Sequence, residues 1–274
     1  MNRASDADAD FKIRILKSAP LFAEAPADDL QELARVGRVA AIQRGKSLAK
    51  RGQEGQEIYV VQSGVGAELH HEPGDERPIL IMLHGPGSVA GLVSALIATK
   101  DKPQDDDDET HGRRIEALSN MSIFAAPAAD VFRVCRRNPD LSARLSMVLA
   151  ERHDDLARTY AQSTHYSLEM RLASFFARVT ALSAQNDWNP VTNVGRISQS
   201  AIAGMLGVSR EHVNRTLAMW ERSGLIFQNK KGEILVQNAK RLAQLSATSA
   251  DRAATEKADD WLWELDAHLD RGIH

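Results

Sequence analysis

The chain has 274 residues and a formal net charge of −3, with 43% hydrophobic and 26% charged residues. This length predicts about two domains, and the composition is typical of a globular protein. The longest apolar run, Val89–Ala98, is too short to cross a bilayer, and the polar amino terminus has no signal-peptide core, so we expect a cytoplasmic protein without a membrane partner. The single cysteine, Cys135, excludes an internal disulfide and an iron-sulfur cluster held by several thiolates of one chain.

The amino-terminal half changes character twice. Residues 1–12 are mostly polar and predict a disordered tail, whereas apolar residues recur at helical spacing over residues 13–36. Short runs of β-formers separated by glycines follow, and they are Val39–Ile42, Ile58–Val61, Ile79–Leu83 and Met121–Phe124. This pattern predicts a jelly-roll-like β-roll or barrel within a domain of residues 13–136. The acidic run Asp105–Glu109 predicts an exposed loop.

A long helix is predicted after the β-region, from about Leu141 to Tyr166, within a segment of residues 137–167. Four residues recur near heptad spacing and form a candidate dimer seam: Leu145, Leu149, Arg152 and Leu156. Such a narrow stripe favours one partner helix and hence a homodimer. Packing of the stripe against the chain's own β-domain is the alternative at this stage.

The segment of residues 168–244 has the pattern of a helix-turn-helix. Ser198 is positioned to cap a short first helix, Gly207 supplies the left-handed residue that ends it, and Ser209 caps the next helix. On that second helix Val213, Leu217 and Trp220 fall at i, i+4 and i+7 and are expected to face inward. A helix, a tight turn and a second capped helix therefore predict a DNA-binding unit.

The outer face of the second predicted helix carries Arg210, Glu211, Asn214 and Arg215. Arginine can bond the guanine edge bidentately in the major groove and glutamate can accept from cytosine, so these residues are candidates for reading bases. A solvated face of an ordinary amphipathic helix is the alternative. Residues 196–241 carry a charge of +5 while the rest of the chain carries −8, which favours one basic face toward phosphate.

A β-hairpin is predicted after the helices, with Lys230 and Lys231 at its tip, in the position of a wing. Residues 245–274 form an extension in which Trp261, Leu262 and Leu265 predict an amphipathic end helix. That helix could dock on the chain itself or on a partner.

The order of these elements resembles the Crp/Fnr family of bacterial transcription regulators, most specifically at Ile197–Ile202 and Val208–Arg215. The resemblance implies an α+β protein with an amino-terminal β-roll sensor, a long dimerisation helix and a carboxy-terminal winged helix-turn-helix. It implies double-stranded DNA with a TGTGA-like half-site, a second copy of the chain and RNA polymerase as partners, and no catalysis. By the same resemblance the outer residues named above read bases, and a further set contacts phosphates: Ser198, Gln199, Ser200, Ser209, Lys230 and Lys231.

The sensor departs from the family members that bind cyclic AMP. Those members hold the ribose and cyclic phosphate with a Gly-Glu pair and an Arg-Ser pair. This chain has Gly91, within the run Gly87–Leu92, where the glutamate is expected, and His111-Gly112 at the Arg-Ser position. Leu156-Ala157 stands where the long helix would offer Thr-Ser to adenine. Because a buried phosphate needs charged partners, cyclic AMP in the usual mode is not expected. The candidate effector pocket consists of Gly87, Val89, Gly91, Leu92, His111, Arg113 and Arg114.

Other functions stay open at this stage. Haem, another nucleotide or no effector at all is compatible with the sensor, and the sequence does not separate an activator from a repressor. A cupin-like metal enzyme fused to a DNA-binding tail is one alternative, with His70, His71 and Glu72 as an incomplete ligand set. A sensor that acts through protein partners is the other. No metal site is predicted.

Overall fold

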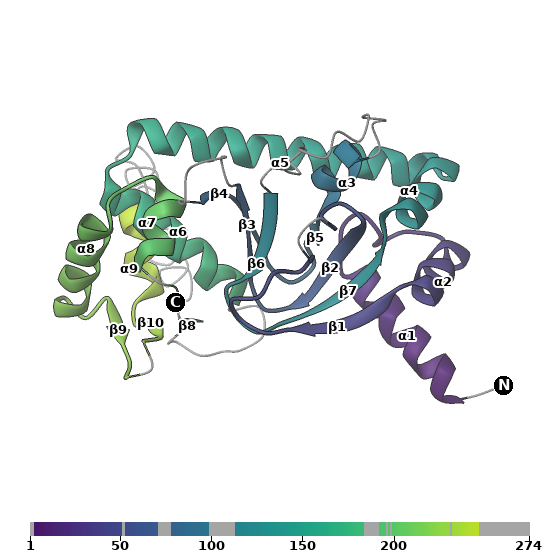
Figure 1. Ribbon diagram of the computed structural model, residues 1–274, viewed down its shortest axis with the longest axis horizontal. Coiled ribbons are helices and arrows are strands. Elements are labelled where there is room, and N and C mark those ends of the chain that lie inside the picture. The colour runs from purple at the N-terminus through teal and green to yellow at the C-terminus, as the bar shows by residue number, and fades with distance from the viewer. Residues whose placement is uncertain are drawn as a thin grey trace, which may run out of the picture.

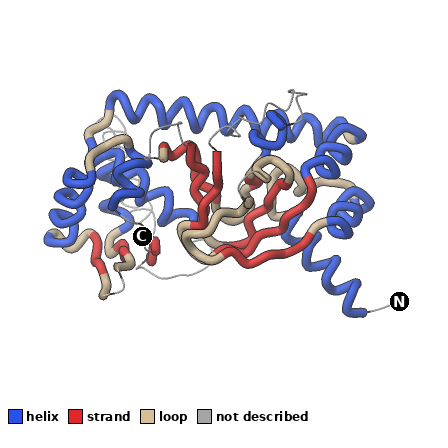
Figure 2. Tube along the Cα trace, in the orientation of Figure 1, coloured by secondary structure: helices blue, strands red, loops and turns tan. Residues whose placement is uncertain are grey.

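The computed structural model describes residues 3–50, 53–70, 78–98, 113–183, 192–195, 197, 199–230 and 232–246. One long helix, α5 (Pro139–His165), runs along the top of the molecule in Figure 1 and joins two lobes. Strands gather in the middle of the molecule and helices lie at both ends, as Figure 2 shows. The predicted acidic loop and the predicted end helix lie outside the described residues.

The chain begins with two helices, α1 (Arg3–Lys17) and α2 (Ala27–Val36). The disordered tail predicted over residues 1–12 is wrong, because α1 is helical from Arg3. The sequence in this stretch alternates Ala with Asp, and alanine is the residue that favours helices most. Its carboxyl end is fixed by packing, since Ile15 and Leu16 are buried in the core of the first lobe.

The β-roll contains two sheets. One sheet has the order β1-β7-β2-β5 and the other has the order β4-β3-β6, and all the pairs are antiparallel. The strands are β1 (Arg38–Ile42), β2 (Glu57–Ser63), β3 (Gly66–His70), β4 (Ile79–His84), β5 (Val89–Ala90), β6 (Arg113–Ala117) and β7 (Met121–Pro127). All four predicted runs of β-formers are confirmed as strands. The sequence missed β3, β5 and β6, whose small or charged residues give a weak strand signal.

Two helices frame the roll before α5 begins. The short helix α3 (Leu92–Ala98) follows β5, and α4 (Ala128–Arg137) follows β7. Phe124, Val131 and Phe132 share one hydrophobic cluster with residues of α1 and α2. Arg137 of α4 also pairs with Asp29 of α2, so apolar contacts and an ion pair join the two helices.

The second lobe is a small helical domain with a three-stranded sheet of order β8-β10-β9. Its elements are α6 (Leu168–Ser183), β8 (Thr192–Gly195), α7 (Gln199–Leu206), α8 (Arg210–Arg222), β9 (Ile226–Gln228), β10 (Ile234–Val236) and α9 (Ala239–Ser246). The centre of its core is aromatic, with Phe176 set edge-to-face between Phe175 and Trp220. The predicted helix-turn-helix and the predicted hairpin are therefore both present.

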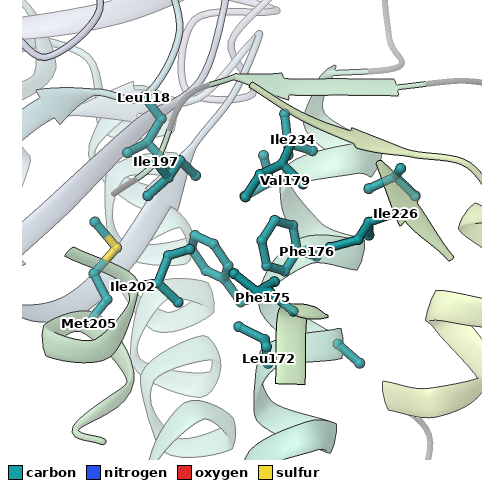
Figure 3. Packing of buried hydrophobic residues seen from close by; sticks show 14 of the residues in the cluster. Leu118, Leu172, Phe175, Phe176, Val179, Ile197, Ile202, Met205, Ile226 and Ile234 are labelled. Atoms are coloured by element: carbon teal, nitrogen blue, oxygen red, sulfur yellow. The ribbon is translucent and has the colours of Figure 1, made fainter. Parts of the chain in front are cut away.

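The two lobes share one hydrophobic cluster. Leu118 of the roll lies beside Ile197 of the second lobe, in the same cluster as Met205 and the core of α6 (Figure 3). Gly85 approaches α6 so closely that a Cβ there would come within 2.5 Å of Leu182 Cδ2. Because β4 and the turn after it touch the second lobe directly, movements of β4 and of the second lobe are expected to be coupled.

Candidate nucleic-acid interface and sensor interior

The turn between α7 and α8 has the predicted geometry. Gly207 adopts φ of +63°, a left-handed conformation that costs glycine little and most residues much. Ser209 then caps α8, and its side chain accepts a hydrogen bond from the backbone N–H of His212 at 3.3 Å. Arg210 begins α8, so both Arg210 and Glu211 stand in its first turn.

The inner face of α8 is buried as predicted. Val213, Leu217 and Trp220 have at most 1% of their surface exposed. The indole Nε1 of Trp220 donates to Glu169 of α6 at 3.2 Å, so the one polar atom of this face has a partner. This anchoring fixes the rotation of α8 about its axis and thereby fixes which residues point outward.

The outer face of α8 presents the four candidate base-reading residues, and all of them are exposed: Arg210, Glu211, Asn214 and Arg215. The amide of Gln199 on α7 donates to Asn214 Oδ1 at 3.3 Å, which ties this face to the preceding helix. The pKa of Glu211 is lowered by a hydrogen bond from its own backbone N–H and by its contact with Ser209. Glu211 is therefore an ionised hydrogen-bond acceptor beside two arginines.

The candidate phosphate-binding residues frame this face. Gln199 and Ser200 are the first residues of α7, Ser209 precedes α8, and Lys230 is exposed at the tip of the β9-β10 hairpin. Backbone N–H groups at a helix amino terminus favour anions. Ser198 and Lys231 lie outside the described residues.

The hairpin itself is held by a network that the sequence did not reveal. Asn229 donates to Glu233 Oε2 at 2.7 Å and accepts from the Glu233 backbone N–H at 3.0 Å. Glu233 also reaches Arg44, in the turn after β1, at 3.7 Å. The wing is thus internally braced and lies against the first lobe at one point.

Comparisons with known proteins agree with this geometry. Residues 170–245 match the model of the Crp-like helix-turn-helix domain. The chain is 23% identical over 219 residues to the fumarate nitrate reduction regulatory protein of Klebsiella oxytoca, covering 80% of this chain and 82% of that protein. It is 23% identical over 235 residues to a CRP-like cAMP-activated global transcriptional regulator of Mycobacterium tuberculosis, covering 84% and 97%. A putative Crp/Fnr regulator from Eubacterium rectale superposes with a TM-score of 0.63 at 20% identity, covering 84% and 99%.

Residues 170–245 carry the Crp-like helix-turn-helix domain, and the matches together support the chain as a Crp/Fnr family regulator. It is a DNA-binding transcription regulator of that family, with a cyclic-nucleotide-binding-like β-roll and a helix-turn-helix. These relatives are transcription regulators. Within the described residues, no helix is long and apolar enough to span a membrane.

In this Crp/Fnr regulator the predicted effector pocket divides between two cavities. Gly91, Arg113 and Arg114 line a cavity of about 20 Å³ beside α3, together with other residues of the roll. Gly87 and Val89 line a different cavity of about 480 Å³ between the turn after β4 and α5. Leu92 is fully buried in the core, and His111 lies outside the described residues.

A buried charged cluster, which the sequence did not predict, lies between these cavities. The carboxylate of Glu68 on β3 contacts His84 Nε2 at 3.0 Å and accepts from Arg113 at 3.2 Å. Glu68 is 4% exposed and His84 is fully buried. Burial raises the pKa of Glu68, but the hydrogen bond to His84 and the charges of His84, Arg152 and Arg113 lower it by more. The pKa of Glu68 is therefore below its ordinary value, and the group is ionised. Burial lowers the pKa of His84, which is therefore neutral and donates from Nε2.

The four residues of the predicted dimer seam have different surroundings within the chain. Arg152 points toward the β-roll, where it lines the larger cavity and acts electrostatically on Glu68. Leu145 packs partly against the core of the first lobe. Leu149 is half-buried, whereas Leu156 and Tyr160 are 41% and 71% exposed. The spacing i, i+7 and i+11 places these three side chains on one face of α5.

Cys135 and the metal site of the cupin alternative are the two remaining candidates from the sequence. Cys135 is buried in the first lobe, and burial raises the pKa of its thiol to about 11. Such a thiol is protonated at neutral pH and unreactive. Within the described residues, no group of three or more His, Cys, Asp and Glu side chains is arranged to hold a metal ion. His71 and Glu72, which the cupin alternative needs, lie outside the described residues.

Proposed function

We propose that this regulator binds a pseudo-palindromic, TGTGA-like operator as a homodimer and that it does so without cyclic AMP. Arg210, Glu211 and Arg215 read base edges, and Asn214 assists them. Phosphates are contacted by Ser198, Gln199, Ser200, Ser209, Lys230 and Lys231. The observation that carries the proposal is the rotation of α8, which buries its apolar side and presents all four polar candidates outward.

The homodimer rests on the uncovered face of α5. Leu149, Leu156 and Tyr160 lie on one side of this helix, and Leu156 and Tyr160 expose large apolar surfaces. An adjacent side of α5 packs on the first lobe through Leu141, Leu145 and Val148. A second copy of the same helix would cover this face as a symmetric pair and would place two α8 helices about 34 Å apart, one turn of DNA.

Independence from cyclic AMP rests on the sensor interior. The cavity beside Gly91 has a volume of about 20 Å³, and pockets for small molecules usually measure about 300 to 1,000 Å³. Gly91 offers no carboxylate, and Leu156 offers no hydroxyl. A ligand shifts an equilibrium only by its differential affinity for the two states, and these positions supply little of it.

No observation favours catalysis, and we propose that the protein acts by binding, with RNA polymerase as its further partner in the cytoplasm. An apolar face and a DNA-reading face on one chain are sufficient for either activation or repression.

The proposal is tested by titrating a fluorescent operator duplex with the purified protein, with and without cyclic AMP. The expected result is the same saturable binding in both titrations and much weaker binding to a scrambled duplex. A saturable gain in operator affinity on adding cyclic AMP would contradict the independence from the nucleotide. Equal affinity for the operator and the scrambled duplex would contradict sequence-specific reading.

A further inference from the structure

The buried cluster in the β-roll joins four elements at one carboxylate. Glu68 belongs to β3, His84 to the end of β4, Arg113 to the start of β6 and Arg152 to the middle of α5. Glu68 uses one carboxylate oxygen for Arg113 and the other for His84. The side chain of Glu68 is thus held from two directions inside the roll.

Arg152 is the member of the cluster that comes from outside the roll. Its guanidinium is largely buried, and Nη1 has no hydrogen-bond partner among the described residues. Burial lowers the pKa of Arg152 below its ordinary value, the charge of Glu68 opposes this shift, and the charge of Arg113 adds to it. Arg152 therefore depends on the negative charge of Glu68, which it approaches without a direct hydrogen bond.

The cluster places two positive guanidinium groups and one negative carboxylate in a low-dielectric interior, so its stability depends on the attraction between opposite charges. Removing an ion from water costs several kcal/mol, and the cost is offset only when the opposite charge is close. Glu68 is the negative charge that the cluster itself provides, because His84 is neutral. Without Glu68, Arg113 and Arg152 would face each other as like charges.

The position of the cluster connects it with DNA binding. Arg152 belongs to α5, the helix that leads into α6 and the DNA-binding lobe. His84 ends β4, and the next residue, Gly85, lies against Leu182 of α6. A change in the cluster is therefore transmitted to the second lobe through α5 and through the turn after β4.

We propose that Glu68 is a positioning residue that acts as a built-in anion, holding Arg113 and Arg152 so that α5 is set for DNA binding without a small anionic effector. This inference rests on the proposed DNA-binding function. The contrasting possibility is that an organic anion enters the cavity of about 480 Å³ beside Arg152 and His84. Glu151 and Asp155 also line that cavity and make its lining partly acidic, which disfavours an anion there.

The experiment measures melting temperature in rising inorganic phosphate at constant ionic strength. The parent protein is expected to show no saturable change. Glu68→Gln keeps the size of the side chain but removes its charge, so it should melt lower and recover as phosphate takes the place of the carboxylate. Glu68→Gln combined with Arg152→Met should melt low without recovery. The matched control is Glu116→Gln, a partly exposed carboxylate on the neighbouring strand that pairs with Arg114, and it should behave like the parent.

Operator binding is measured on the same proteins. Glu68→Gln should bind the operator roughly tenfold more weakly than the parent, and phosphate should restore most of that loss in parallel with the melting temperature. A merely structural role for Glu68 would not produce this rescue by an anion. If Glu68→Gln does not fold, Arg152→Met and Arg152→Lys replace it. The first should lose operator affinity, and the second should retain it because the charge is kept.

Two results would overturn the proposal. One is saturable stabilisation of the parent by phosphate that disappears in Arg152→Met. Arg152 would then bind an external anion even in the presence of Glu68. The other is a Glu68→Gln protein whose melting and operator affinity are indifferent to phosphate. Failure of DNA binding by the parent would instead refute the proposed function, and the melting measurements would still decide the role of Glu68.

Discussion

The two lobes use charged residues in opposite ways. On α8 the arginines and Glu211 are exposed, and each is held in place by an apolar face on the other side of the same helix. In the β-roll the charged residues are buried and hold one another. The first arrangement suits an external partner, whereas the second leaves little unpaired charge for one. This contrast fits the proposal that the DNA-reading surface is set without a small anionic effector.

The largest expected effect comes from the face of α5 that the β-roll leaves uncovered. Leu149→Asp together with Leu156→Asp should place carboxylates in the dimer contact and dissociate it, because a buried unpaired charge is costly. Loss of the second α8 should weaken binding to a palindrome by about 100-fold or more. Sedimentation measures the mass and anisotropy measures the affinity.

The matched control for this double variant is Met147→Asp. Met147 is 62% exposed, and its spacing places it on the opposite side of α5 from Leu156. This variant should remain a dimer with parental affinity. A parent protein that sediments as a monomer while bound to a full palindrome would refute the dimer contact.

The next largest effect concerns base reading. Arg210→Ala or Arg215→Ala should lose about 1 to 3 kcal/mol on the best operator and should relax base preference, because a bidentate contact to guanine disappears. Binding to scrambled DNA should change much less. Unchanged affinity of Arg210→Ala for its best operator would show that another element reads the bases.

The buried charged residues of the β-roll should make the stability of the protein sensitive to acid. The pKa of His84 is lowered by burial below its ordinary value of 6.5, so the unfolded chain binds a proton before the folded protein does. The contribution of His84 to the free energy of unfolding is fully present above pH 6.5. Below pH 6.5 this free energy falls by at most about 1.4 kcal/mol for each pH unit. The lowered pKa of Glu68 adds a loss of the same sign below 4.5.

Melting temperatures across this pH range check the assignment. His84→Gln keeps an N–H donor for Glu68 but does not titrate, so its stability should depend less on pH just below 6.5. An equally steep loss in the parent and in His84→Gln would assign the acid sensitivity to another group.

The smallest effect is expected at the wing. Lys230→Ala should weaken binding to all DNA sequences to a similar degree and should reduce the slope of affinity against salt by about one charge. Base preference should remain that of the parent. A selective loss on the operator alone would mean that Lys230 reads sequence rather than phosphate.

The DNA-binding lobe could be predicted well because its signals are local. Ser209, Gly207 and the i, i+4, i+7 spacing of Val213, Leu217 and Trp220 each act within a few residues of the chain. The cluster around Glu68 could not be predicted in this way, since its hydrogen-bonded partners lie 16 and 45 residues away. The only local signal was a glutamate within a strand of small and apolar residues.

Arg152 shows the limit of periodicity. Its heptad spacing with Leu149 and Leu156 was compatible with a partner helix or with the chain's own roll, and the structure turns it toward the roll. The helix at Arg3–Lys17 was missed for a related reason, since packing of its last turn supports a polar beginning. Contacts between distant segments decided both cases.

We propose that two α8 helices, one from each copy of the chain, read a pseudo-palindrome with Arg210, Glu211 and Arg215. Selection of bound duplexes from a random pool, without added nucleotide, tests it most directly. The parent protein should enrich two inverted TGTGA-like half-sites centred about one helical turn apart, and Arg210→Ala should lose the preference at one base pair of each half-site. Enrichment of a single half-site, of a direct repeat or of no motif would contradict the account.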